Sequence, residues 1–228
     1  MICFVAAMEK EIRPILARFS FREEAFGKIS KLYHMEGRGC RFLLLVSGVG
    51  KGFASSALAA VLTRYGEQID AVLNVGVGGS LDPNRAGLQS AIFGSTYLQY
   101  DMDTSAVGDP VGMLSGLNMI ELPGDASLLQ KAEAVCKQFG YAHAQGKIAS
   151  GDTFVASFAK IQDIQAKFPG ILSVDMESAA YAQVCFCYEK PFLACRFVSD
   201  TGAAGEYEAN FPACQQELTE FVCAYLGA

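Results

Sequence analysis

One stretch of this chain decides its fold: Val174-Asp175-Met176-Glu177-Ser178-Ala179-Ala180. It joins a short apolar run to a helical pattern, so Glu177 stands just past a predicted strand. Asp200 follows a second apolar run, and Glu11 stands in the equivalent place after the first one. Ligands of open α/β sheets bind beyond the carboxyl ends of the strands. The sequence therefore predicts that three carboxylates converge on one crevice, where they would serve acid/base chemistry on a polar small molecule.

The rest of the chain alternates between short apolar runs and helical patterns. The predicted strands are Ile2–Ala7, Phe42–Val46, Ala71–Val75, Lys147–Ala149, Ile171–Val174 and Phe192–Val198. The predicted helices are Met8–Phe19, Gly52–Tyr65, Ala126–Phe139, Phe158–Phe168, Met176–Cys187 and Cys214–Leu226. This alternation predicts an α/β fold with a mainly parallel, helix-covered sheet. We expect a single domain over residues 1–228, with a long loop from Tyr97 to Pro123 that carries at most short elements.

Composition narrows the classes of partner. The 228 residues carry a net charge of −6 and no Lys/Arg run, which argues against nucleic acid or an anionic membrane as partner. Ile2–Ala7 is too short for a signal-peptide core, so a cytoplasmic location is expected. The eight cysteines lie mostly in apolar patterns and are interpreted as reduced core thiols. With only two histidines, there is no zinc pattern and no metal site is expected.

Two glycine clusters, Ser47–Gly52 and Asn74–Ser80, follow predicted strands and indicate turns where backbone can approach a ligand. Neither has the spacing of a phosphate-binding or dinucleotide-binding loop. Asp152 is either a site residue or the N-cap of the following helix, and Phe154 either stacks on a planar base or belongs to the core. Glu177, Asp200 and Glu11 also have purely structural interpretations, at a helix start, in a turn and on a solvated face.

Six motifs together resemble one known family. They are Ala7–Glu11, Ser47–Lys51, Asn74–Gly79, Ser150–Phe154, Asp175–Ala179 and Arg196–Asp200. In order and spacing they resemble the methylthioadenosine/S-adenosylhomocysteine nucleosidases of the purine nucleoside phosphorylase superfamily. The resemblance implies a three-layer α/β/α sandwich around a mostly parallel or mixed sheet. It also implies hydrolysis of the bond between adenine and a 5′-thio-substituted ribose, without metal or organic cofactor.

By position, the resemblance assigns catalytic roles to three residues. Asp200 corresponds to the acid that protonates the purine at N7, which requires a raised pKa. Glu11 corresponds to the base that deprotonates the attacking water, and Arg196 helps to hold that water. Breaking the bond to adenine makes the sugar oxocarbenium-like, so carboxylates near the sugar stabilise the developing positive charge.

The resemblance also implies a set of residues that contact the substrate. Glu177 would bind the ribose hydroxyls with Met176 against the sugar, and Phe154 would stack on adenine while the Val155 backbone binds its edge. Further contacts are expected from Val77, Gly78, Ser199, Met8 and Val49. The 5′ subsite would be completed by a loop of the partner subunit, carrying Thr104 and Val107, so a homodimer is expected.

Departures from the family pattern leave alternatives open. Val77 stands where these nucleosidases usually have serine, and Thr104 and Val107 are smaller than the usual residues, so a larger 5′ substituent such as that of futalosine could fit. Phosphorolysis is disfavoured, because Asn74 and Val77 stand where the related phosphorylases have the arginine and serine that hold phosphate. A catalytically silent purine-binding protein is the alternative outside the enzymes. Retention of Glu11, Glu177 and Asp200 argues against it, because binding alone requires no acid and base.

Overall fold

The computed structural model describes residues 1–37 and 39–227. Its strands are β1 Ile2–Ala6, β2 Ser20–Ala25, β3 Lys31–Gly37, β4 Cys40–Val46, β5 Ala71–Ser80, β6 Ala91–Gln99, β7 Leu122–Pro123, β8 His143–Ser150, β9 Ile171–Asp175 and β10 Phe192–Asp200. Its α-helices are α1 Glu9–Leu16, α2 Lys51–Tyr65, α3 Ala126–Phe139, α4 Phe158–Lys167, α5 Ser178–Cys187 and α6 Glu206–Gly227. Short 3₁₀ turns are η1 Gly66–Gln68 and η2 Ser105–Val107. None of the helices described is long and apolar enough to cross a membrane.

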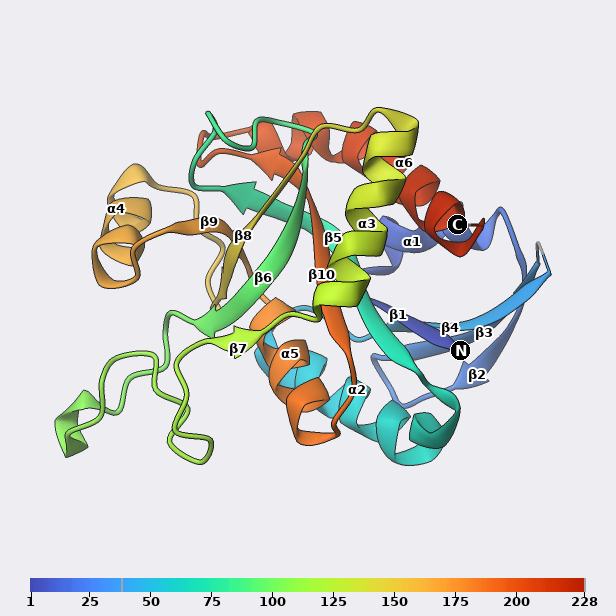
Figure 1. Cartoon of the computed structure of the whole chain (residues 1–228), viewed down its shortest axis with the longest axis horizontal. Helices are drawn as coiled ribbons and strands as arrows, with labels where there is room; N and C mark the ends of the chain where they lie inside the picture. The colour runs from blue at the N-terminus through green and yellow to red at the C-terminus, as the bar shows by residue number, and fades with distance from the viewer. Residues whose placement is uncertain (38, 228) are drawn as a thin grey trace.

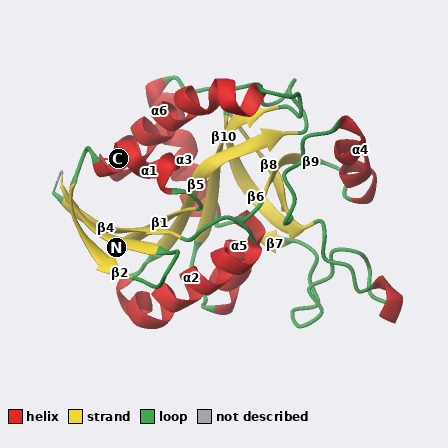
Figure 2. Ribbon diagram, turned by 180° about the vertical axis from the view of Figure 1, so that it is seen from behind, coloured by secondary structure: helices red, strands yellow, loops and turns green. Residues whose placement is uncertain are grey.

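The strands form one mixed sheet in the order β10-β6-β8-β9-β5-β1-β4-β3-β2, with β7 beside β6 (Figures 1 and 2). Strand β5 also pairs with β10, so β5, β10, β6, β8 and β9 close into a ring at one end of the sheet. Parallel pairing joins β4, β1, β5 and β10, which places their carboxyl ends at one edge. At the far end of β5, Gly79 and Ser80 pair antiparallel with β9, which brings the end of β9 to the same region.

Helices cover both faces of the sheet, and strand alternation decides which side chains meet them. Figure 1 shows α2 and α5 on one side and α1, α3 and α6 on the other. On β10, Ala194 and Val198 pack with the α2/α5 side, while Cys195 and Phe197 pack with the α1/α3/α6 side. Arg196 has the same parity as Ala194 and Val198, so this buried cation faces the α2/α5 layer. The predicted three-layer α/β/α fold is confirmed.

The six predicted strands and six predicted helices are all present, but four strands were not predicted. These are the β2–β3 hairpin, β6 and the two-residue β7, and the loop predicted from Tyr97 to Pro123 overlaps the end of β6 and contains β7. Gly94 explains why β6 is hard to recognise. A Cβ there would lie 2.2 Å from the Tyr97 ring, so the strand contains a small residue and a register shift instead of an apolar run. The second glycine cluster was also misplaced, because it continues β5 to Ser80 and forms no turn.

All eight cysteines are free, and their interpretation as core thiols is confirmed for the six that are buried. Six of them are buried, Cys40 is half-buried, and Cys187 is exposed at the end of α5. Burial raises the pKa of Cys3 to about 12, so this thiol stays protonated and packs as a small apolar side chain.

Candidate active site

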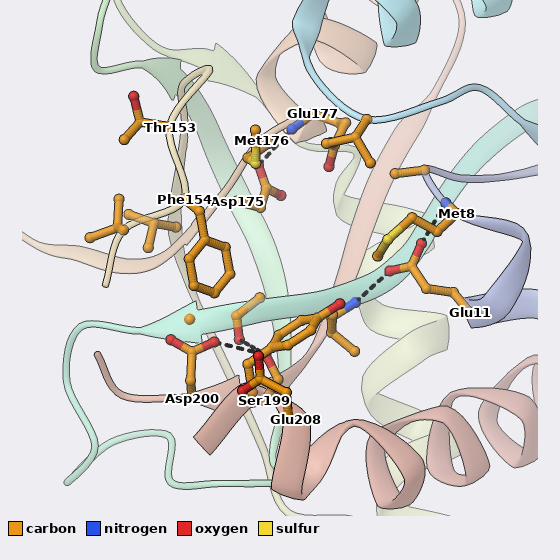
Figure 3. A pocket seen from close by; sticks show the side chains of 18 residues that line it. Met8, Glu11, Thr153, Phe154, Asp175, Met176, Glu177, Ser199, Asp200 and Glu208 are labelled. Carbon is orange, nitrogen blue, oxygen red and sulfur yellow. Dashed lines mark hydrogen bonds between the residues drawn. The ribbon is translucent and has the colours of Figure 1, made fainter. Parts of the chain in front are cut away.

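A cavity of about 350 Å³ opens where the strand ends converge. It is lined by Ala7, Met8, Glu11, Val49, Val77, Gly78, Gly79, Thr153, Phe154, Val155, Val174, Asp175, Met176, Glu177, Ser199, Asp200, Tyr207 and Glu208. These residues follow or end six strands, together with the starts of α1 and α6. Figure 3 shows Asp200 and Phe154 at one end, Glu11 and Met8 at the other, and Glu177 on a third side. The three predicted carboxylates therefore share one cavity.

Glu11 is held at the start of α1 by the backbone around it. Its Oε2 accepts a hydrogen bond from the Met8 N–H (2.9 Å), which is the reach-back contact of a capping box, and its Oε1 accepts from the Val77 N–H (3.1 Å). The residue is only 2% exposed. Burial raises the pKa of this carboxyl, while the nearby Arg196 charge opposes that rise. Two backbone donors therefore fix the position of this carboxylate in the cavity wall.

Asp200 ends β10 at the opposite end of the cavity. Its Oδ2 accepts a hydrogen bond from the Ser199 hydroxyl (2.9 Å). Gly79 makes room for the carboxyl, because a Cβ at that position would lie 3.1 Å from Asp200 Oδ1. Burial raises the pKa of Asp200, which favours the protonated acid. A protonated carboxyl at this place can donate a proton to a ligand.

Asp175 and Glu177 are only two residues apart, but their carboxylates make different contacts. Asp175 Oδ1 accepts from the backbone N–H groups of Glu177 and Ser178 (both 3.1 Å), which lie at the N-cap and first position of α5. The Glu177 carboxylate is thereby free to cross to the next loop, where its Oε1 accepts from the Gly50 N–H (2.8 Å). Burial raises the pKa of Glu177 to about 7, although the charge of Arg196 opposes the rise. Glu177 does stand at the start of α5, as its N-cap, but its carboxylate binds the Gly50 N–H of another loop and lines the cavity.

Arg196 lies beneath the cavity and does not line it. Its Nε donates to Asp175 Oδ2 (2.7 Å) and its Nη2 donates to Asn74 Oδ1 (2.5 Å), with Glu177 Oε2 at 3.9 Å from Nη2. Gly76 lies between this guanidinium and the Glu11 carboxylate. A Cβ at Gly76 would lie 2.4 Å from Arg196 Nη1 and 2.7 Å from Glu11 Oε1. Arg196 thus supplies positive charge from below, fixed by a buried ion pair.

The remaining predicted contact residues fall into two groups. Those that line the cavity are Met8, Val49, Val77, Gly78, Phe154, Val155, Met176 and Ser199. Thr104 and Val107 do not: they lie at η2 on the arm that protrudes from the body at the lower left of Figure 1, and Val107 is 82% exposed. Their predicted role requires a second subunit.

The structure also corrects one assignment and adds residues. Asp152 does not cap the following helix, whose N-cap is Ser157; its Oδ1 instead accepts from the N–H of Lys51, at the start of α2. Tyr207 and Glu208 line the cavity because α6 begins at Glu206, eight residues earlier than its first predicted residue, Cys214. The acidic residues of its first turn are the sequence signal that could have placed this start.

Comparison with known proteins shows the family to which this chain belongs. The family model described as "Phosphorylase superfamily" matches residues 1–227, so the chain belongs to the phosphorylase superfamily. Within it, the chain is 33% identical to the 5′-methylthioadenosine/S-adenosylhomocysteine nucleosidase of Geobacillus thermodenitrificans, over 90% of this chain and 85% of that protein. The resemblance inferred from the six motifs is confirmed.

Solved structures agree. The nucleosidase of the same name from Neisseria meningitidis, in complex with methylthio-immucillin-A, superposes with a TM-score of 0.90 at 29% identity, covering 99% of this chain and 97% of that one. The futalosine hydrolase of Helicobacter pylori gives a TM-score of 0.91 at 25% identity, with coverage of 99% and 97%.

Proposed function

We propose that this protein hydrolyses the N-glycosidic bond of 5′-methylthioadenosine and S-adenosylhomocysteine, releasing adenine and the 5′-thio-substituted ribose. The observation that carries the proposal is the placement of Asp200 and Glu11 at opposite ends of one cavity, with Glu177 between them (Figure 3). Bond cleavage by water needs an acid for the leaving group and a base for the nucleophile on different sides of the sugar.

In this mechanism Asp200 gives its proton to N7 of the purine, and the bond between C1′ and N9 breaks with its electron pair moving to the base. Adenine leaves neutral. Glu11 removes a proton from water, whose oxygen then bonds to C1′ of the oxocarbenium-like sugar. The raised pKa of Asp200 supports its role as acid, and the two backbone donors that hold Glu11 support its role as base. Each proton transfer typically contributes about 10²–10⁴ in rate.

The other groups position the substrate. Glu177 accepts hydrogen bonds from the ribose hydroxyls, with Met176 against the sugar. Phe154 stacks on adenine and the Val155 backbone pairs with its edge, which the 56% exposure of Phe154 beside the cavity supports. Arg196, below the cavity, stabilises the ionised form of Glu11 through its charge, so its part in holding the attacking water is indirect, through Glu11. The function of the named relatives supports the same substrates.

Futalosine is the second candidate substrate. The fold likeness to a futalosine hydrolase and the small side chains of Thr104 and Val107 favour a roomier 5′ subsite. Phosphorolysis is less well supported. Five carboxylates, Glu11, Asp175, Glu177, Asp200 and Glu208, line the cavity, and its lining among the described residues includes no Lys or Arg that would attract phosphate.

The proposed enzyme works as a homodimer whose partner loop, with Thr104 and Val107, covers the 5′ end of the substrate. The exposure of Val107 supports this arrangement, since an apolar side chain on a protruding arm gains from being covered. We also propose that residues 1–228 form one domain, supported by the pairing of β5 with both β1 and β10. The free cysteines support a reducing, cytoplasmic location.

The test is release of free base from methylthioadenosine, S-adenosylhomocysteine, adenosine and futalosine, with and without phosphate. The proposal expects adenine from the two thio-nucleosides at a rate that does not depend on phosphate. Turnover of futalosine alone would assign the second candidate. Phosphate dependence would indicate a phosphorylase, and tight binding without turnover would indicate a silent binding protein.

A further inference from the structure

Three residues outside the cavity form a closed ring of interactions, which we call the Lys51–Asp101–Asp152 ring. The backbone N–H of Lys51 donates to Asp152 Oδ1 (2.8 Å), and the backbone N–H of Asp152 donates to Asp101 Oδ2 (2.9 Å). The ring is closed by the Lys51 ammonium, whose Nζ lies 2.5 Å from Asp101 Oδ1. The three residues come from the loops after β4, β6 and β8. None of them lines the cavity described above.

The ring is directly connected to the sugar-binding side of the site. Gly50, the residue before Lys51, donates its N–H to Glu177 Oε1 at 2.8 Å. Gly50 has φ +94°, and a Cβ there would lie 3.0 Å from Asp152 Oδ1. Asp152 therefore holds the Gly50 backbone in two ways. Its carboxylate packs against Gly50, and it accepts the N–H of the next residue, Lys51.

The ring is connected to the base-binding side through Asp152. Phe154 and Val155, which line the cavity, follow Asp152 by two and three residues. The loop that carries them is also contacted by Tyr100, whose hydroxyl donates to the Thr153 carbonyl (3.1 Å). Tyr100 precedes Asp101, so the segment 100–101 holds both ends of the short stretch 152–153.

Asp101 is the residue on which these connections depend. Each of its carboxylate oxygens holds a different loop: Oδ1 the Lys51 ammonium, and Oδ2 the Asp152 backbone. The Lys51 ammonium has a second acceptor in Gln99 Oε1 (3.0 Å), and its side chain is only 17% exposed. Hydrogen bonds to charged groups in such surroundings are stronger than neutral ones. Replacing one carboxylate would release two loops that contact the substrate.

We propose that Asp101 is a positioning residue that sets the substrate affinity of this site by fixing the sugar-binding and base-binding loops in register. The inference rests on the proposed function for the identity of the substrate. Asp101 acts on binding surfaces, whereas Glu11 and Asp200 are fixed by bonds of their own. Loss of Asp101 therefore weakens binding of the ground state and of the transition state equally, which raises KM and leaves kcat unchanged.

The experiment compares Asp101→Asn and Asp101→Ala with Asp70→Asn. Asp70 is the matched control, because its Oδ2 also pairs with an ammonium, that of Met1 (2.6 Å), and it lies just before β5, away from the cavity and from the arm that carries Thr104 and Val107. Steady-state cleavage of methylthioadenosine and calorimetric binding of adenine are measured for each protein, with thermal unfolding alongside. Asp101→Ala should raise KM and the Kd of adenine by about tenfold, with kcat within about twofold of wild type. Asp101→Asn keeps the shape and one acceptor oxygen, so a smaller rise is expected.

Three results would overturn the inference: unchanged KM and adenine affinity in both Asp101 variants, a fall in kcat without a rise in KM, or the same effect from Asp70→Asn. If Asp101→Ala does not fold, Asp101→Asn decides the matter. Failure of the proposed function has a different signature. A wild-type protein that binds adenine but cleaves nothing refutes the hydrolase, and the adenine affinities still test Asp101. A wild-type protein that does not bind adenine refutes both.

Discussion

Replacing Glu177 with glutamine should stabilise this protein, and by more at pH 8 than at pH 5. Glu177 is 5% exposed, and burial raises its pKa from 4.5 to about 7. Between these values the folded state binds more protons than the unfolded state, so stability falls as the pH rises through this window. Above it the buried charge carries its full cost, and glutamine removes that cost. The amide oxygen of glutamine can still accept the Gly50 N–H.

The magnitude follows from the same two values. The difference between 4.5 and about 7, at about 1.36 kcal/mol per pKa unit, gives about 3 kcal/mol at pH 8. Linkage gives about 1 kcal/mol at pH 5, because the folded carboxyl is already protonated there. Arg196 keeps its ion pair with Asp175 in both proteins, so the substitution leaves no unpaired cation.

Urea unfolding at pH 5 and pH 8, at one fixed protein concentration, measures the effect. Glu208→Gln is the control for loss of one charge, because Glu208 is an exposed carboxylate in the same cavity. An equal change in unfolding free energy at the two pH values would refute the reasoning, as would destabilisation at pH 8. Either result would mean that the Glu177 carboxylate is better solvated or better paired than its surroundings indicate.

Three further substitutions test the site. Asp200→Asn should lower kcat on methylthioadenosine by about 10²–10⁴-fold with unchanged thermal unfolding, since asparagine has no proton to transfer, and near-wild-type adenine release would remove Asp200 from its role. Glu11→Gln should lower kcat by about 10² or more while adenine still binds, and calorimetry showing lost adenine binding with intact turnover would contradict this. Gly76→Ala should lower the unfolding free energy by about 1–3 kcal/mol, because its Cβ would meet Arg196 Nη1 at 2.4 Å. Gly116→Ala has open space within 4 Å and is its control, so equal urea midpoints for the two variants would oppose the steric argument.

The sequence predicted the strands correctly wherever they contain a continuous apolar run. The strands containing Phe42–Val46 and Phe192–Val198 were recognisable because buried strands read as continuous apolar runs. The β2 strand was missed because its six residues are mostly polar and exposed, so burial leaves no pattern in them. The first two turns of α6 were missed because Pro212 interrupts the helical pattern.

The site was predictable only as far as strand ends could be located. Glu11, Glu177 and Asp200 were predicted to converge because each follows a strand, and they share one cavity. The different contacts of Asp175 and Glu177 were not predictable, because the sequence does not say which carboxylate binds the first N–H groups of α5 and which reaches the Gly50 loop. Arg196 was predicted to lie at the site. Its position beneath the cavity needs a glycine at position 76, because a Cβ there would collide with the guanidinium, and only the structure shows this contact.

Closure of β5, β10, β6, β8 and β9 into a ring leaves β2 as the one long open edge among the strands described. An unpaired edge offers its backbone to any other strand that meets it, and this is a common route to fibrils. The β2 edge carries the charged residues Arg22, Glu23 and Glu24 in succession, and charged side chains on an edge strand oppose its pairing with another chain. We therefore expect the small hairpin, which contributes nothing to the cavity, to oppose edge-to-edge association of two copies.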